Sequence, residues 1–565
     1  MEPWYWLNEN SRAFLARGYL AKGQTAEERV RVIGETAEKI LNKPGFADKI
    51  VKYTSLGWIS FSSPVWSNFG AGRGLPISCF GSYIADDMAS ILYTSGEVGM
   101  MSKYGGGTSA YFGDLRPRGA AISDTGSSNG PVTFMQLFNT MVNVVSQGSV
   151  RRGNLAAYMP IEHMDILEFL DIATEGNPIQ GLTHAVTVTD AWLEEMAAGD
   201  AEKRAIWARV IQRRGEMGFP YIVFIDNANN HTVDVYKDKG LKIVASNLCS
   251  EIMLPSNDDW SFVCCLSSIN VLFYDDWKDT DLVETVTFFL DAVMSEFCTK
   301  LEALRDSTDP QKQQAFYFME RAYRFAMENR ALGLGVLGWH SLLQAKMLPF
   351  ESPEANALNL EVFKNIGEKA KVASVEMGAL YGEPAVLKGY GRRNTTTMAI
   401  APTTSSAFIL GQVSQGIEPV WSNCYVKDVA KLKVTIKNPN VLKLLAEKGK
   451  DTKEVWESIR DNDGSVQHLD FLSDNERAVF RTFSEIDQNA VIDQAAARQP
   501  YIDQGQSLNV MVSPDVSAKD INALYMRAWK SGVKALYYQH SMNAAQQMVR
   551  KKLASQLAEQ KKGEE

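Results

Sequence analysis

Apolar residues recur with helical spacing in several stretches of the chain. In residues 25–42, TAEERVRVIGETAEKILN, they follow a Thr-x-x-Glu start that is typical of a helix capping box. Short apolar or β-rich pieces lie between such stretches, among them FPYIVFID, SFVCCLSSINVLFY and KALYYQ. Strands that alternate with helices predict an α/β fold with mainly parallel strands. The further predicted helices lie near 161–173, 190–213, 279–304, 311–329, 353–380 and 518–531.

The composition is that of a large globular protein and excludes several classes. The 565 residues are 45% hydrophobic and 22% charged, which is ample material for a sizeable core. A formal net charge of -9 provides no basic field, so neither nucleic acid nor a membrane surface is an expected partner. No stretch approaches the roughly 20 consecutive apolar residues that span a bilayer.

The cysteines favour a chemical role for thiols. There are six, without any C-x-x-C pair, which is too few for a disulfide framework and the wrong spacing for a zinc site. The start MEPWYWLNENSRAFL is not typical of a signal peptide, so we expect a cytoplasmic protein in a reducing compartment. The cysteines stand at positions 79, 249, 264, 265, 298 and 424.

Two glycine-rich stretches predict nucleotide binding. KYGGGTSAYFGDLRPRG (103–119) contains Arg116, and SQGSVRRGN (146–154) contains Arg151. Glycine lets the backbone approach a phosphate, and arginine binds phosphate through two parallel hydrogen bonds. A third stretch, GLGVLG (333–338), matches G-x-G-x-x-G, but a helical pattern precedes it where a dinucleotide site needs a strand. Tight backbone packing is the better interpretation there.

The stretch SNLCSEIMLP carries an amide, a thiol and a carboxylate at alternate positions: Asn247, Cys249 and Glu251. If this segment is an extended strand, the three side chains leave one face. A cysteine on a strand is most often a small buried apolar residue. Buried Asn and Glu need polar partners, however, and the hydroxyl groups of a sugar would supply them.

Other polar features lie in apolar surroundings. Cys79 follows Ser78, and Cys264 is followed directly by Cys265. In PTTSSAF (402–408), four hydroxyl residues follow a proline, which suits either a helix cap or a phosphate-binding turn. Tyr537 and Tyr538 are adjacent, which usually reflects packing in a strand and less often a redox role.

Together these motifs resemble the large catalytic subunit of class I ribonucleotide reductases, in matching order from about residue 55 to about 545. The motifs are SCFGSYIADD, GGGTSAYFGDLRPRG, SQGSVRRG, SNLCSEI, VCCLSS, APTTSSAF, GIEP and LYYQ. The resemblance implies a ten-stranded α/β barrel of two parallel five-stranded halves. It divides the chain into a helical N-terminal region (1–55), a catalytic barrel with effector-binding elements (56–545) and a charged tail (546–565).

The resemblance also implies roles for the thiols and their neighbours. Cys249 would become a transient thiyl radical that abstracts the ribose 3′ hydrogen, while Glu251 takes the 3′ hydroxyl proton and Asn247 hydrogen-bonds the sugar. Cys79 and Cys264 would supply two electrons as the 2′ hydroxyl leaves as water. Cys264 is preferred to Cys265 because the family spacing is Cys-x-Leu before small polar residues.

The remaining implied roles concern the radical path and the nucleotide sites. Tyr537 and Tyr538 would carry the oxidising equivalent to the thiol. Asp86, Arg116 and Arg151 match an allosteric site that binds deoxynucleoside triphosphates or ATP. Positions that match substrate-binding residues, besides Asn247 and Glu251, are Ser63, Ser78, Gly107, Pro402, Thr403, Thr404, Ser405 and Ser406.

The implied partners are a second copy of the chain, thioredoxin or glutaredoxin, and a small radical-generating subunit with a dinuclear metal cofactor. No metal site is expected in this chain. Two departures from the family pattern are expected: this chain would lack the N-terminal ATP cone, and, since its last cysteine is Cys424, it would lack the C-terminal cysteine pair. The alternatives are an adenosylcobalamin-dependent reductase, which the tyrosine pair disfavours, and a non-catalytic nucleotide-binding regulator.

Overall fold

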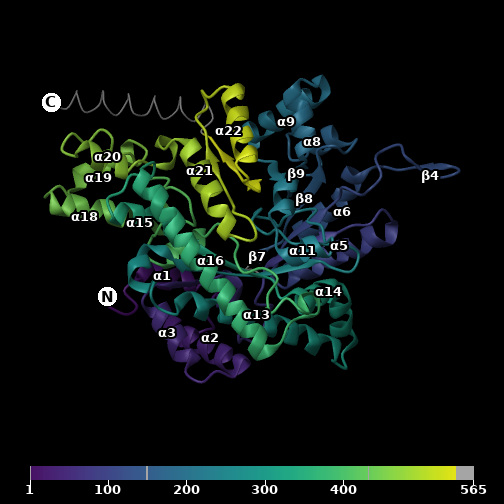
Figure 1. Cartoon of the computed structure of the whole chain (residues 1–565), viewed down its shortest axis with the longest axis horizontal. Coiled ribbons are helices and arrows are strands. Elements are labelled where there is room, and N and C mark those ends of the chain that lie inside the picture. The colour runs from purple at the N-terminus through teal and green to yellow at the C-terminus, as the bar shows by residue number, and fades with distance from the viewer. Residues whose placement is uncertain (1, 148–150, 430–431, 542–565) are drawn as a thin grey trace.

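A computed structural model describes residues 2–147, 151–429 and 432–541 of the chain (Figure 1). Its centre is a nine-stranded mixed sheet with the order β1-β11-β2-β3-β8-β9-β10-β16, in which β12 also pairs with β11. Five neighbouring strands are parallel to one another. They are β2 (Cys79–Tyr83), β3 (Gly107–Tyr111), β8 (Asn154–Pro160), β9 (Leu182–Val188) and β10 (Tyr221–Phe224).

The second part of the sheet begins where β11 (Phe262–Asn270) joins β2 in antiparallel fashion. On its other side β11 pairs in parallel with β12 (Leu332–Leu337) and antiparallel with β1 (Ile59–Phe61). At the far end of the sheet, β16 (Ala535–Leu536) pairs antiparallel with β10. The two antiparallel junctions therefore bound the five parallel strands on both sides.

Single bridges continue the hydrogen bonding beyond β12. Leu334 N donates to Thr397 O at 2.7 Å, Ile400 N to Gly505 O at 3.0 Å, and Tyr537 N to Leu508 O at 2.9 Å. These bonds lead from β12 towards β16 through segments that are too irregular to count as strands. The α/β class is confirmed with a curled mixed sheet, while closure into ten strands stays a prediction.

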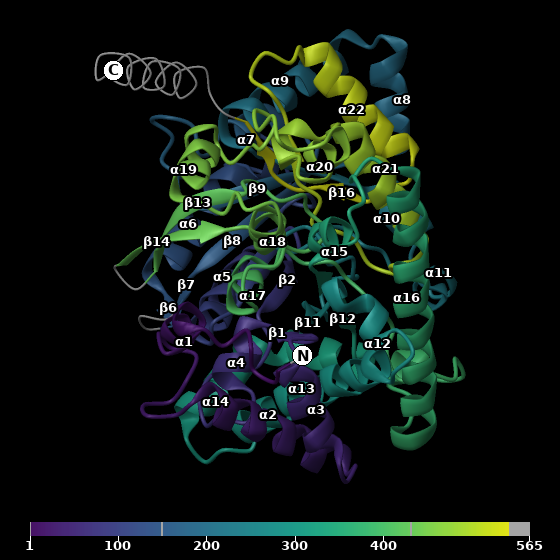
Figure 2. The same ribbon diagram turned by 90° about the vertical axis from the view of Figure 1, so that its left-hand side faces the viewer.

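Helices cover both ends of the sheet (Figures 1 and 2). α2 and α3 lie at one end of the molecule, and α8, α9 and α22 lie at the other. The N-terminal helices are α1 (Glu9–Leu15), α2 (Ala26–Leu41), α3 (Phe46–Ser55) and α4 (Ser63–Asn68). Further helices along the chain are α5 (Met88–Lys103), α6 (Pro131–Val144), α8 (Asp190–Ala198), α9 (Ala201–Met217), α13 (Leu282–Arg305), α14 (Pro310–Asn329), α16 (Pro353–Tyr381), α21 (Gln488–Arg498) and α22 (Ala518–Lys530).

Smaller elements complete the fold. The short helices are α7 (Ile166–Leu170), α10 (Ile225–Asn230), α11 (Asp234–Asp238), α12 (Tyr274–Trp277), α15 (Trp339–Ala345), α17 (Thr404–Ile409), α18 (Pro439–Glu447), α19 (Lys453–Asp461) and α20 (Asp474–Val479). The two-stranded ribbons are β4 (Ala121–Ser123) with β5 (Gly126–Ser127), β6 (Ser146–Gln147) with β7 (Arg151–Arg152), β13 (Cys424–Val429) with β14 (Leu432–Lys437), and β15 (Val510–Met511) with β17 (Gln539–His540).

Local sequence explains most element boundaries. The predicted capping box at Thr25 is present, with Thr25 and Glu28 each bonding the backbone N–H of the other. The predicted helix 190–213 is two helices, because Gly199 adopts a left-handed conformation (φ 114°) and Asp200 caps a new helix. The stretch GLGVLG forms β12, where a Cβ on Gly335 would lie 2.9 Å from Ala399 O. Tight packing is therefore the reason for these glycines.

Within the described residues, no helix is both long and apolar enough to cross a lipid bilayer.

Candidate active site

The segment 247–251 is a tight turn, so the prediction that it is an extended strand was wrong. Ser250 adopts a left-handed backbone conformation with φ of 66°, and its N–H donates to Asn247 O at 3.3 Å. The side-chain oxygen of Asn247 accepts hydrogen bonds from the N–H groups of Glu251 (3.1 Å) and Ile252 (3.3 Å). Asparagine favours such turns because its side chain can bond the backbone a few residues on.

The carboxylate of Glu251 lies in the protein interior, where the side chain is 1% exposed. Burial raises its pKa from 4.5 to about 7, although hydrogen bonds to backbone, Ser507 and Asn247 oppose the shift. Ser507 Oγ lies 2.9 Å from Glu251 Oε2 and 2.5 Å from the carbonyl oxygen of Cys249. The turn thus places the carboxylate beside the cysteine backbone, and Glu251 can exchange a proton near neutral pH.

The two predicted redox cysteines lie opposite each other where β2 pairs antiparallel with β11. Cys79 on β2 and Cys264 on β11 are direct partners in the register, whereas Cys265 pairs with Leu332 on β12. Directly opposed residues have Cα atoms about 4.5–5.5 Å apart, which lies within the range that a disulfide spans. No disulfide joins any two of the described cysteines.

Each thiol also contacts a polar side chain of the site. Asn247 Nδ2 lies 3.8 Å from Cys79 Sγ, and Gln504 Nε2 lies 3.4 Å from Cys264 Sγ. Burial raises the pKa of Cys264, the hydrogen bond from Gln504 opposes this shift, and nearby Cys265 and then Glu251 raise the pKa further. The pKa of Cys265 is raised by burial, then by Asp291 and then by Cys79. Cys265 therefore also lies close to Cys79. Strand register and proximity to Glu251 favour Cys264 as the partner of Cys79.

A group of tyrosines adjoins Cys249. The rings of Tyr537 and Tyr538 have centroids 4.5 Å apart, and Tyr221 packs against them at 4.7 and 5.1 Å. The pKa of Tyr537 is raised, first by burial and then by the charge of Cys249, with which it also shares a hydrogen bond. The adjacent tyrosine pair therefore runs from the thiol towards the protein exterior.

Two of the predicted substrate-binding residues, Ser78 and Gly107, lie beside Cys79. Ser78, Gly107 and Cys79 lie together, because Gly107 N donates to Ser78 O at 2.6 Å and Gly107 is the register partner of Cys79. A Cβ on Gly107 would meet Leu248 Cδ2 at 3.2 Å, so glycine lets the 247–251 turn approach β3. Ser63 lies beside Tyr19, with 3.2 Å between their hydroxyl oxygens.

The hydroxyl-rich loop 402–406 leads into α17. Pro402, Ser405 and Ser406 are half-buried, and the helix begins at Thr404, where N–H groups without intrahelical acceptors can bind an anion. Thr403 Oγ1 accepts from Gly416 N at 2.8 Å, and Thr404 Oγ1 donates to Gln415 Oε1 at 3.1 Å. These bonds hold the loop to the following segment rather than to the turn at Cys249.

Two of the predicted effector-binding residues contact each other. Arg116 Nε donates to Asp86 Oδ2 at 2.7 Å, and Arg116 N donates to Asp86 Oδ1 at 3.1 Å. The pair lies on the surface next to β4. The side chain of Arg151 and the predicted tail 546–565 lie outside the described residues, so those predictions are not tested.

Sequence reasoning missed the residues that reach the site from the segment after α21. Ser507 contacts Glu251 and Cys249, and Gln504 contacts Cys264 while its side-chain oxygen accepts from Met253 N at 3.0 Å. The feature that could have pointed to these residues is the series of polar side chains Gln504, Gln506 and Ser507, which are buried in an extended segment. Buried polar side chains need partners, but the sequence does not show which.

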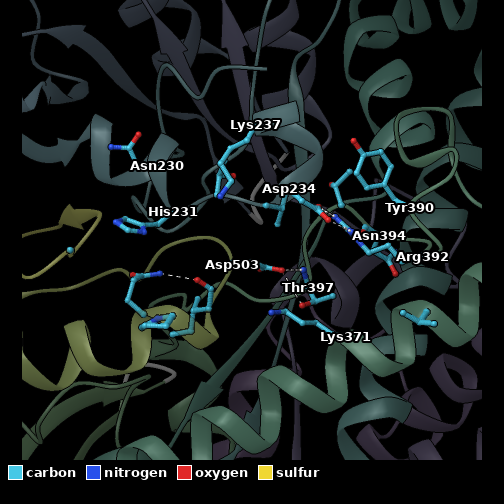
Figure 3. A pocket seen from close by; sticks show the side chains of 18 of the residues that line it. Asn230, His231, Asp234, Lys237, Lys371, Tyr390, Arg392, Asn394, Thr397 and Asp503 are labelled. Atoms are coloured by element: carbon cyan, nitrogen blue, oxygen red, sulfur yellow. Dashed lines mark hydrogen bonds and ion pairs between the residues drawn. The ribbon is translucent and has the colours of Figure 1, made fainter. Parts of the chain in front are cut away.

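One cavity of the molecule lies away from the predicted site residues. It has a volume of about 680 Å³, and its lining includes none of the predicted site residues. Figure 3 shows Lys371, Thr397 and Asp503 near one another there; the Asp503 carboxylate accepts from the N–H groups of Thr397 (2.8 Å) and Met398 (2.9 Å). A second cavity of about 730 Å³ is lined by Thr404 and by His540. The thiols, the carboxylate and the tyrosines, not cavity size, define the candidate site.

Comparisons with known proteins identify the family to which the chain belongs. A family model described as "Ribonucleotide reductase, barrel domain" matches residues 77–203, 194–387 and 384–539. The chain belongs to the ribonucleotide reductase large-subunit family. The ribonucleoside-diphosphate reductase large subunit of Invertebrate iridescent virus 3 is 31% identical over 568 residues, covering 87% of this chain and 87% of the viral protein.

Similarity extends to cellular members of the ribonucleotide reductase family and to a solved structure. The ribonucleoside-diphosphate reductase large subunit of Caenorhabditis elegans is 29% identical and covers 85% of this chain and 69% of its own length. The Actinobacillus ureae class Id ribonucleotide reductase alpha subunit superposes with a TM-score of 0.90 at 56% identity, covering 96% of this chain and 99% of that one. The overall architecture is therefore that of a class I alpha subunit.

We expect mild oxidation with diamide to join Cys79 to Cys264, because these residues are opposed on paired strands. Peptide mapping by mass spectrometry should find this disulfide in the wild-type chain and in Cys265→Ser, which serves as the matched control. It should be missing from Cys264→Ser. A link from Cys79 to Cys265 in the wild-type chain would contradict the assignment of Cys264.

Proposed function

We propose that this chain reduces ribonucleoside diphosphates to 2′-deoxyribonucleotides by a thiyl-radical mechanism. The observation that carries the proposal is the convergence of Cys249, Glu251 and Asn247 in one turn beside the opposed thiols of Cys79 and Cys264. A turn, unlike a strand, gathers the thiol and the carboxylate around a single point where a ribose can lie. The family relationship supports the same activity.

The chemistry follows from these positions. A Cys249 thiyl radical takes the 3′ hydrogen atom of the ribose, while the Glu251 carboxylate accepts the proton of the 3′ hydroxyl. The 2′ hydroxyl then leaves as water, and Cys79 and Cys264 provide the two electrons and become a disulfide. Return of the hydrogen atom from Cys249 to C3′ completes the deoxynucleotide. The diphosphate would lie at the start of α17, within the hydroxyl-rich loop 402–406.

The oxidising equivalent would reach Cys249 through Tyr538 and Tyr537, whose rings are in contact with each other. We infer that it comes from a small partner subunit, which supplies a dinuclear metal and radical cofactor when bound. The class I relationship further suggests a homodimer, effector nucleotides at Asp86, Arg116 and Arg151, and thioredoxin or glutaredoxin as reductant. An adenosylcobalamin-dependent reductase and a non-catalytic regulator are the competing functions.

A single-turnover assay distinguishes these functions. Reduced chain, candidate small subunit and ribonucleoside diphosphate should yield deoxynucleotide, and neither component alone should do so. Activity with adenosylcobalamin and no small subunit would support the cobalamin-dependent alternative instead. Absence of product under every condition, with nucleotide binding retained, would favour the regulator.

The rate of the chemical step should depend on the ionisation of Glu251. Its raised pKa of about 7 means that the carboxylate is protonated below that pH and can accept a proton only above it. We therefore expect the single-turnover rate to rise through pH 7. Glu251→Gln should lower that rate by about 10²–10⁴ and remove this pH dependence. An acid limb near the ordinary pKa of 4.5 would contradict the raised pKa of Glu251, and an unchanged rate in Glu251→Gln would show that this carboxylate is not the base.

A further inference from the structure

The line of aromatic rings does not stop at Tyr538. The ring of His540 lies 5.7 Å from that of Tyr538, and the indole of Trp421 lies 4.4 Å from His540. Exposure increases along this line, from 8% for Tyr537 to 41% for Trp421. Trp421 and His540 both line the cavity of about 730 Å³. A continuous set of ring contacts therefore joins the surface to the tyrosine next to Cys249.

The indole of Trp421 has a buried carboxylate as its hydrogen-bond acceptor. Trp421 Nε1 donates to Glu418 Oε2 at 3.0 Å, and the Glu418 side chain is only 7% exposed. Asn509 Nδ2 donates to the other carboxylate oxygen of Glu418, and Asn509 Oδ1 accepts from Tyr538 N at 3.0 Å. One short network thus fixes Trp421, Glu418 and the backbone of Tyr538 relative to one another.

The protonation states of Glu418 and His540 suit this network to an oxidation that is coupled to proton transfer. Burial raises the pKa of Glu418 to about 6, while its bonds to Trp421 and Asn509 oppose the shift. At neutral pH the carboxylate is therefore mostly ionised and able to accept a proton. Burial, and next the nearby Arg214, lowers the pKa of His540 to about 4, so the ring between Trp421 and Tyr538 is uncharged. A neutral imidazole adds no positive charge that would oppose oxidation of either neighbour.

We propose that Trp421 is the entry point of the radical path in this chain, with Glu418 as the acceptor of the indole proton and His540 as the bridge to Tyr538. This inference rests on the proposed function, since it extends the tyrosine path that serves Cys249. It differs from a path that enters directly at Tyr538, because that ring is half-buried and Trp421 is the exposed end of the line.

The proposed step balances in electrons and protons. A one-electron oxidant of the small subunit takes one electron from the Trp421 indole, and the Nε1 proton passes to Glu418. The resulting neutral indolyl radical then takes one electron from Tyr538 across His540 and regains its proton from Glu418. Tyr538 releases its phenolic proton to solvent and becomes a phenoxyl radical. Indole and phenol have similar reduction potentials in water, so the transfer needs no large driving force.

The test compares three variants of the full chain in the single-turnover assay with the small subunit. Trp421→Phe should lower product formation by at least about tenfold, since a phenyl ring cannot be oxidised by this route. Trp421→Tyr, which restores an oxidisable ring, should recover part of the rate. Tyr425→Phe is the matched control, because Tyr425 lines the same cavity and is 39% exposed but is not one of the rings that pair with His540 along the described path. It should keep the wild-type rate.

Binding of the small subunit must be measured in parallel, because Trp421 is exposed. We expect Trp421→Phe to bind the small subunit and effector nucleotides as the wild type does. Wild-type turnover in Trp421→Phe would overturn the inference. It would also be overturned if Trp421→Phe and Trp421→Tyr lost turnover equally and in proportion to a loss of affinity for the small subunit. Tyr538→Phe distinguishes failure of the proposed function from failure of the proposed entry point. If Tyr538→Phe is inactive while Trp421→Phe is fully active, the proposed function stands and only the entry point is wrong. If Tyr538→Phe retains full turnover, the tyrosine path itself fails.

Discussion

The side-chain oxygen of Asn247 accepts hydrogen bonds from two backbone N–H groups, and the candidate site depends on this interaction. It folds residues 247–251 into a turn and leaves Ser250 in a left-handed conformation between the thiol and the carboxylate. An aliphatic residue at position 247 would leave those N–H groups without this acceptor inside the protein. The same turn buries Glu251, and burial is what brings its pKa near neutrality. One amide thus determines both the geometry and the proton chemistry.

The second constraint is the antiparallel junction between β2 and β11. There β11 runs antiparallel to β2, and among the described strands it is the one place where two cysteines are register partners. The Cα separation of directly opposed residues lies in the range that a disulfide spans, so this pair can donate two electrons by forming one. Gly107, the other register partner of Cys79, lets the turn pack closely against the strands. The sheet therefore positions the reducing thiols, and the turn positions the radical thiol.

Local patterns predicted the secondary structure well where they were strong. The capped helix at 26–41 and the long helices α13, α14 and α16 lie within a few residues of the predicted ranges, because their apolar periodicity is unambiguous. The alternation of Asn247, Cys249 and Glu251 suggested a strand, which was wrong. A hydrogen bond from a side chain to the backbone overrides a period-two pattern, and no periodicity reveals it in advance.

Contacts between residues that are far apart along the chain could not be predicted from the sequence. Ser507 lies 256 positions from Glu251, and Gln504 lies 240 positions from Cys264, so only the fold shows that they meet. The order of the motifs, by contrast, identified the family, because eight short stretches must agree at once. Motifs therefore named the residues of the site, whereas the structure was needed to show how Asn247, Cys79 and Cys264 approach one another.

The most direct test of the convergent site is a crystal structure of the chain with a bound ribonucleoside diphosphate. We expect the ribose to lie in the turn, with its C3′ atom against Cys249 Sγ, its 3′ hydroxyl hydrogen-bonded to Glu251 and its phosphates at the start of α17. A ribose bound instead in the cavity beside Lys371, with Cys249 and Glu251 untouched by the ligand, would contradict the role assigned to the turn.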